Sequence, residues 1–185
     1  MRLTQRAQEL VAQYLSVGMT AVDATAGNGH DTLFLAQCVG PNGMVHAIDI
    51  QEAAITATRQ RLNAAGELTQ VVLHCKSHAN WSMILLNEHR TEIDAIMMNL
   101  GYLPSGDKLI ATKSETTILA IQEAFAWLKP GGIMTILAYV GHPGGDEECN
   151  EVRTTLLQEL GNASLLHEEP SREGSNGPVL FWFLR

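Results

Sequence analysis

Apolar and polar residues along this chain follow two spacings in turn, and each spacing predicts one kind of element. Short apolar or alternating runs indicate strands, whereas apolar residues three to four positions apart indicate helices. Seven strands are predicted, at residues 19–23, 44–48, 71–75, 93–98, 133–139, 164–167 and 179–184. Helices are predicted between them, at residues 3–15, 31–39, 52–65, 79–87, 114–128 and 146–160.

Strands that alternate with helices predict one α/β domain over residues 1–185, a doubly wound Rossmann-like domain with a seven-stranded, mostly parallel sheet. The run at 93–98 is apolar almost throughout, which is typical of a strand that helices cover on both faces. Residues 129–132, Lys-Pro-Gly-Gly, are predicted to form the turn before the fifth strand. We expect the last strand to be antiparallel to the others.

The composition indicates how large a core the chain can bury and in which compartment it is expected. With 185 residues, of which 45% are apolar and 17% charged, the chain is long enough for one buried core. No apolar run approaches the ~20 residues of a membrane-spanning helix, and the N-terminus lacks the apolar centre of a signal peptide. The three cysteines are odd in number and far apart, which suits a reducing cytoplasm and no zinc motif. We therefore expect a cytoplasmic protein without a metal.

The net charge of −8 argues against broad tracking of nucleic-acid phosphates, which needs an excess of lysine and arginine. A local basic patch around one pocket is still compatible with this charge. Any RNA substrate should then be held by few contacts or with help from a partner subunit, so a homodimer is one arrangement to consider.

A glycine-containing turn after the first strand is the main candidate for a cofactor site. Asp23 ends the strand, Gly27 and Gly29 follow four and six residues later, and a helix begins directly after them. Glycines let a ligand approach the backbone closely, and the helix N-terminus directs free N–H groups at it. A dinucleotide site needs a third glycine, which is missing here. The spacing instead fits the first motif of class I S-adenosylmethionine (SAM) methyltransferases, with Thr25 at the first glycine position and Asn28 also in the site.

Asp49 ends the second strand about 20 residues past the glycines, where a carboxylate can accept hydrogen bonds from both ribose hydroxyls. We place Gln51 in the same cofactor site. The alternative for Asp49 is an exposed acid at the end of a strand, without a binding role. His78 follows the third strand, at the position where methyltransferases contact the adenine ring. Asn80, two residues later, is as readily explained as a helix cap.

The segment Asn-Leu-Gly-Tyr-Leu-Pro at 99–104 follows the fourth strand and resembles the Asp/Asn-Pro-Pro-Tyr motif of amino-directed methyltransferases. An amine that attacks a methyl group needs its hydrogens held by acceptors, which the Asn99 amide oxygen and the Leu100 carbonyl can supply. Gly101 lies between them and Tyr102, which can stack on a base or pack near the sulfonium. An ordinary loop with a capping asparagine is the alternative.

A second loop, at 139–145, is expected beside the same edge of the sheet. Its three glycines indicate a loop that a ligand approaches closely. Tyr139 and His142 are its candidate substrate contacts, and His142 could hold a phosphate or relay a proton. Lys108 borders the loop after the fourth strand, where it could meet an RNA phosphate. Solvent-exposed charge and a bystander histidine are the alternatives.

Three stretches together resemble one family. They are Asp-Ala-Thr-Ala-Gly-Asn-Gly-His-Asp-Thr at 23–32, Asn-Leu-Gly-Tyr-Leu-Pro-Ser-Gly-Asp-Lys at 99–108 with the threonines at 116 and 117, and Tyr-Val-Gly-His-Pro-Gly-Gly-Asp-Glu-Glu at 139–148. On these motifs the chain is similar, over essentially its whole length, to the bacterial YtqB-like rRNA methylase family. Members of this family include a methyltransferase that acts on 5-aminomethyl-2-thiouridine at the tRNA wobble position.

The resemblance implies methyl transfer from SAM to the primary amine of this modified uridine, in the anticodon stem-loop of tRNA. It implies that Gly27, Asn28, Gly29 and Asp49 hold SAM, and that Asn99, Tyr102, Tyr139 and His142 surround the nucleotide. Nothing in composition or spacing identifies that substrate. An rRNA or small-molecule amine methyltransferase, a nicotinamide-dependent oxidoreductase and a non-enzymatic SAM-binding module are the alternatives.

Overall fold

The computed structural model describes residues 2–80, 85, 92–101, 112–140, 144–162, 165–171 and 177–185. Within these residues the strands are β1 (Thr20–Asp23), β2 (Met44–Asp49), β3 (Val71–Cys75), β4 (Ile93–Leu100), β5 (Leu128–Ala138), β6 (His167–Pro170) and β7 (Val179–Leu184). The helices are α1 (Leu3–Val11), α2 (His30–Val39), α3 (Glu52–Ala65), α5 (Ser114–Trp127) and α6 (Gly145–Leu160), with a 3₁₀ turn η1 (His78–Asn80).

All seven strands form one sheet in the order β3-β2-β1-β4-β5-β7-β6. The pairs from β3 to β5 are parallel, whereas β7 is antiparallel to both of its neighbours. The predicted doubly wound sheet with an antiparallel last strand is therefore confirmed. Between β1 and β4 the strand order reverses direction, and open α/β sheets bind ligands at the carboxyl ends of the strands at such a point.

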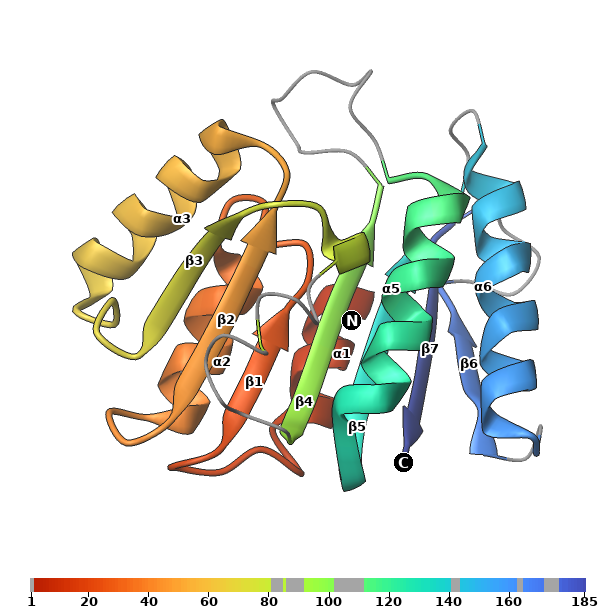
Figure 1. Ribbon diagram of the computed structural model, residues 1–185, viewed down its shortest axis with the longest axis horizontal. Helices are drawn as coiled ribbons and strands as arrows, with labels where there is room; N and C mark the ends of the chain where they lie inside the picture. The colour runs from red at the N-terminus through yellow and green to blue at the C-terminus, as the bar shows by residue number, and fades with distance from the viewer. Residues whose placement is uncertain are drawn as a thin grey trace.

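Helices cover both faces of the sheet, with α1 and α2 behind it and α5 and α6 in front (Figure 1). Successive residues of a strand point to opposite faces, and the strands accordingly contribute to two cores. Val22 and Ile96 belong to the core under α5 and α6, whereas their neighbours Ala21 and Ala95 belong to the core under α1 and α2. Strands β1 and β4 are thus buried on both faces, which explains their continuous apolar sequence.

Several boundaries differ from the predicted ones. β4 continues through Asn99 and Leu100, which were expected in a loop, because both residues pair with β5. β6 covers His167–Pro170 instead of 164–167, since pairing with β7 sets its register. The first helix ends at Val11, before the predicted residue 15. Of the predicted helix at 79–87 the structure describes residues 79 and 80, in η1, and the helical, buried residue Leu85; the rest lies outside the described residues.

The segment at 129–132 is not the predicted turn between a helix and a strand. It lies inside β5, whose pairing with β4 is irregular at this point: Leu128 pairs with Ile93, and the next pair is Ile133 with Ala95. The extra residues pair with the end of the chain, where the N–H of Gly131 donates to the Arg185 carbonyl at 2.7 Å. Lys129 also forms an ion pair with Asp94. These distant contacts override the local turn signal.

Gly29, just before α2, lies where the first turn packs closely against α3. It has a positive φ of 75°, and a Cβ there would lie 2.8 Å from the Thr58 Cα in α3. Gly66 has the same φ of 75° with no neighbour near its Cβ position, so it is a matched control. We expect Gly66→Ala to lower the free energy of unfolding by about 1 kcal/mol through backbone strain alone. Gly29→Ala should lower it by a further ~1–3 kcal/mol because backbone must move.

Urea unfolding of the two variants and the parent protein measures these differences. Equal losses in the two variants would show that α3 does not press on the turn.

Candidate functional site

The strand register creates a recess at the point where the sheet order reverses. Asp23, the last residue of β1, pairs with Ala47 of β2 and with Met97 of β4. Both flanking strands therefore continue beyond the end of β1: β2 for two residues, to Asp49, and β4 for three, through Asn99 to Leu100. The glycine turn at 24–29 follows Asp23 directly, so the three predicted motif positions meet at one edge of the sheet.

The Asp49 side of the recess is organised by main-chain hydrogen bonds. The N–H of Gly27 donates to Oδ2 of Asp49 at 2.9 Å, and the N–H of Gln51 donates to Oδ1 at 2.9 Å. Because each carboxylate oxygen has two acceptor positions, each oxygen of Asp49 still has one position that none of the described residues occupies and that a ligand hydroxyl could take. Gln51 thus contributes its backbone, and it is the residue that precedes α3.

The Asn99 side is tied to the same turn. The N–H of Ala24 donates to the Met97 carbonyl at 2.9 Å, and the N–H of Asn99 donates to Oγ1 of Thr25 at 2.7 Å. Thr25 stands where SAM methyltransferases usually have the first glycine, and here its hydroxyl supports the end of β4. The structure therefore gives this departure from the motif a local role.

Asp23 is a buried acid, 1% exposed. Its carboxylate accepts the Thr32 hydroxyl at 2.6 Å and the N–H of Thr25 at 3.2 Å. Burial raises the pKa of Asp23 to about 7, and the nearby charge of Asp31 adds to this rise. Asp23 supports the turn from inside.

Asp31 and Gln8 were not among the predicted site residues. Asp31 lies in the first turn of α2 and is 8% exposed. It accepts hydrogen bonds from the Gln8 amide of α1, at 2.6 Å, and from the Asn99 amide. In the sequence, an acid in the first turn of a helix indicates only a favourable interaction with the helix dipole, and nothing connects Gln8 with a strand end.

His78 lies in η1, three residues beyond the end of β3, and β3 pairs at its last residue with Asp49. Its Nε2 atom is buried and has no hydrogen-bond partner among the described residues. Burial lowers the pKa of His78 to about 4, so the ring is neutral at pH 7. A buried ring nitrogen without a partner, on the segment that follows β3, is suited to a ligand that has hydrogen-bonding edges, such as adenine.

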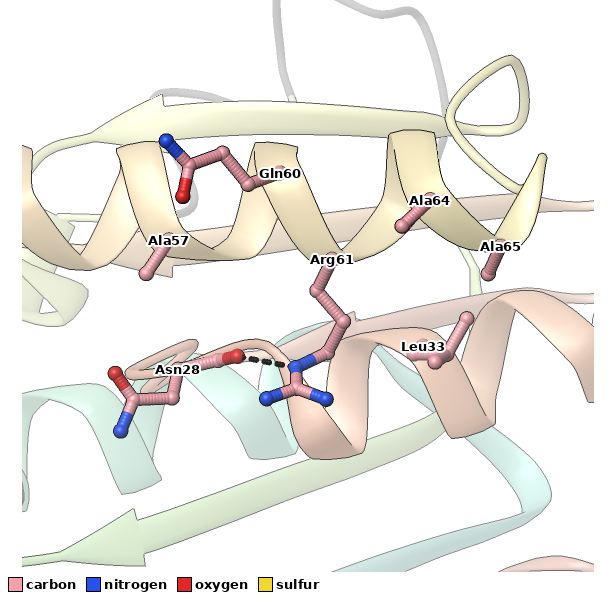
Figure 2. A pocket seen from close by; sticks show the side chains of 7 residues that line it. All are labelled: Asn28, Leu33, Ala57, Gln60, Arg61, Ala64 and Ala65. Atoms are coloured by element: carbon pink, nitrogen blue, oxygen red, sulfur yellow. Dashed lines mark hydrogen bonds between the residues drawn. The ribbon is translucent and has the colours of Figure 1, made fainter.

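Asn28 faces a different hollow. Its side chain lines a pocket of about 530 Å³ between α2 and α3, together with Gln60 and Arg61, and its carbonyl accepts the Arg61 Nε–H at 2.6 Å (Figure 2). This pocket is on the helical layer and not at the strand ends. The Asn28 carbonyl therefore joins the turn before α2 to Arg61 of α3.

On the acceptor side the structure describes part of the predicted set. The Leu100 side chain is buried, and its carbonyl accepts the N–H of Tyr139 at 3.3 Å. A Cβ at Gly101 would be 3.7 Å from the Tyr139 Cβ, so these two residues lie side by side. Tyr139 is 39% exposed. The other predicted substrate residues lie outside the described residues; they are Tyr102, Lys108 and His142.

A family described as "Putative rRNA methylase" has a model that matches residues 45–181, which is most of the chain. The chain belongs to this family. A tRNA (mnm⁵s²U34)-methyltransferase, chloroplastic, of Arabidopsis thaliana is 39% identical over 159 residues, which cover 82% of this chain and 57% of the relative. A demethylmenaquinone methyltransferase of Bacillus cytotoxicus is 30% identical over 115 residues, or 62% of this chain and 42% of the relative. The chain thus spans about half the length of these curated relatives.

Solved structures agree with this family. A "putative rRNA-methylase" from Clostridium thermocellum has a TM-score of 0.85 and 34% identity, with 100% of this chain and 97% of that chain covered. A "putative methyltransferase" from Streptococcus mutans, in complex with S-adenosylhomocysteine (SAH), has a TM-score of 0.80 and 31% identity, covering 100% and 98%. These findings confirm the predicted family and the fold of the SAM-dependent methyltransferases.

The described residues fit SAM in three respects. Gly27 and Gly29 adopt positive φ values of 53° and 75°, and as glycines they have no side chain that would cover the turn. Asp49 has a free acceptor position on each oxygen, and His78 has an unpaired buried nitrogen. The described residues contain no cluster of metal-ligating side chains and no helix long and apolar enough to cross a membrane.

The raised pKa of Asp23 predicts a pH effect on stability. Between its ordinary pKa of 3.8 and the folded value of about 7, the folded state keeps a proton that the unfolded chain has lost. The contribution of this group is full below pH ~4 and is lost as the pH rises through 7. Asp23→Asn removes this dependence. The free energy of unfolding of the variant, relative to that of the parent, should therefore be on the order of 1–3 kcal/mol higher at pH 8 than at pH 5.

Urea unfolding at both pH values measures the effect, with Asp146→Asn in the exposed first turn of α6 as the control. If the free energy of unfolding changed between pH 5 and pH 8 by the same amount in both variants, this would contradict a raised pKa at Asp23.

Proposed function

We propose that this protein is a single-domain, SAM-dependent N-methyltransferase that methylates the primary amine of 5-aminomethyl-2-thiouridine at the wobble position of tRNA. The observation that carries the proposal is the position of Asn99. Asn99 lies at the carboxyl end of β4, where its backbone N–H donates to Thr25 of the glycine turn and its carboxamide donates to Asp31 of α2. The Arabidopsis relative, whose name specifies the modified wobble uridine U34, supports the choice of substrate.

When bound, SAM supplies an electrophilic methyl group whose C–S bond breaks, with its electron pair left on sulfur, as the amine lone pair forms the new N–C bond. Asp49 would hold the ribose hydroxyls, the Gly27–Gly29 backbone would lie against the cofactor, and the neutral ring of His78 would contact adenine. These residues bind and orient. Because a neutral amine needs little acid–base help, positioning should account for most of the rate.

Asn99 would hold the acceptor amine. An amide oxygen accepts hydrogen bonds from an amine N–H, and this leaves the nitrogen lone pair free to point at the methyl group. The Leu100 carbonyl already accepts the Tyr139 N–H, so only its second acceptor position is available for the amine. Tyr139, half-exposed beside it, is placed to contact the base.

We also propose a macromolecular substrate, an oligomeric state and a compartment. The anticodon stem-loop of tRNA would be the macromolecular substrate, with a homodimer as a way to supply further RNA contacts to a chain of net charge −8. All three cysteines are free thiols, which supports the proposed cytoplasmic location. An rRNA or a small-molecule amine is the alternative substrate.

The decisive experiment is methylation of tRNA that carries 5-aminomethyl-2-thiouridine. The protein and SAM are incubated with this tRNA, and the nucleosides are analysed by mass spectrometry. We expect the wobble nucleoside to gain the mass of one CH₂ group, while tRNA without the aminomethyl group stays unchanged. Turnover of SAM with rRNA or a free amine but not with this tRNA would overturn the proposed substrate.

Asn99→Ala should lower kcat by ~10–10³-fold, the range expected when a positioning contact is lost, with the affinity for SAM nearly unchanged. Single-turnover methylation and calorimetric SAM titration measure the two quantities. Asn63→Ala, at an exposed asparagine of α3, is the control. Loss of SAM binding in parallel with kcat would show that Asn99 serves the cofactor instead of the amine.

Asp49→Ala should weaken SAM binding by ~10–10²-fold, because two charge-assisted hydrogen bonds to the ribose are lost. Glu52→Ala removes a neighbouring exposed carboxylate from the first turn of α3 and controls for the change of charge. Calorimetric titration with SAM gives both dissociation constants. Equal effects of the two substitutions would mean that only long-range charge matters.

A further inference from the structure

Three polar side chains from distant parts of the chain form one continuous set of hydrogen bonds. Gln8 of α1 donates through Nε2 to Oδ1 of Asp31 at 2.6 Å, and Asn99 of β4 donates through Nδ2 to Oδ2 of the same carboxylate. Asp31 is thus the centre of the set and lies between the first helix and the end of β4. It holds the residue that we assign to the acceptor amine.

A carboxylate accepts hydrogen bonds and donates none. Both amides must therefore turn their NH₂ groups toward Asp31. The Oδ1 atom of Asn99 is consequently the end of the carboxamide that points away from Asp31. None of the described residues donates a hydrogen bond to Asn99 Oδ1. The Asn99 backbone is also held, because its N–H donates to Thr25 at 2.7 Å, so the carboxamide starts from a defined position at the end of β4.

Asp31 has features that packing alone does not explain. It is 8% exposed, and it makes no ion pair within the described part of the chain. A buried carboxylate without a cationic partner is unfavourable for folding. Its charge raises the pKa of Tyr139 in addition to the effect of burial, which indicates that the carboxylate lies close to the acceptor side of the recess.

We propose that Asp31, held by Gln8, is a positioning residue that orients the Asn99 carboxamide so that its oxygen, and not its nitrogen, faces the methyl acceptor. With the amide reversed, its NH₂ group would meet the hydrogens of an amine, and no hydrogen bond would form. The acceptor's identity as an amine rests on the proposed function. The orientation itself rests on the hydrogen bonds to Asp31.

Asp31→Asn is the direct test, since the new amide can donate to the Asn99 oxygen and so reverse the Asn99 carboxamide. We expect kcat to fall by ~10–10²-fold while KM for SAM changes less than ~3-fold. Gln8→Leu, which leaves Asp31 in place, should lower kcat less, and it should have no further effect when Asp31 is already substituted. Gln13→Leu removes an exposed amide just after α1 and should leave kcat unchanged.

A second measurement needs no RNA. Sinefungin is a SAM analogue with a primary amine in place of the transferred methyl group, whereas SAH has no group there. Asp31→Asn and Asn99→Ala should each weaken sinefungin binding by at least ~10-fold and SAH binding by less than ~3-fold. In the Asn99→Ala background, Asp31→Asn should add little, because Asp31 acts through Asn99.

Three results would overturn the inference: equal weakening of sinefungin and SAH by Asp31→Asn, no change in either, or additive effects of the two substitutions on sinefungin. Thermal unfolding of each variant checks that it is folded. If the parent protein methylates no aminomethyl-uridine tRNA but the sinefungin results hold, the proposed substrate fails and the role of Asp31 stands.

Discussion

The site depends on one constraint: beyond the end of β1, β2 continues for two residues and β4 for three. The turn after Asp23 consequently has polar partners on both sides, which are the Asp49 carboxylate for the Gly27 N–H and the β4 backbone for the N–H of Ala24. A buried backbone N–H without a partner is unfavourable. The hydrogen bonds that keep the turn in place thus also determine its distance from Asp49 and Asn99.

The same recess gathers negative charge. Asp23, Asp31 and Asp49 lie around the end of β1, and within the described residues none of them is in an ion pair. Burial of Asp23, together with the nearby charges of Asp31 and Asp49, raises its pKa to about 7. A sulfonium or an ammonium group is the kind of ligand such an arrangement favours, because a nearby cation stabilises the charged form of each carboxylate. The electrostatics and the proposed chemistry are consistent in this respect.

Much of this arrangement could be predicted from local patterns. A strand followed by Gly27 and Gly29, and an acid about 20 residues further on, indicate a nucleotide-type site because parallel strands end at one edge of a sheet. Asp31 and Gln8 could not be found in this way, since their contact joins residues 23 positions apart on two helices. The position of Asn28 beside Arg61, and the extension of β5 back to Leu128, likewise depend on distant partners.

The sequence by itself determined the class of fold, the order of the elements and the family, because hydrophobic period, glycine spacing and short motifs are local properties of the chain. The tertiary structure decided which polar groups share a hydrogen bond, and with it the support of Asn99 by Thr25 and Asp31. Such pairings follow from strand register and from the packing of helices on the sheet. Both are set by the combined burial of residues far apart in the chain, which no single stretch of sequence encodes.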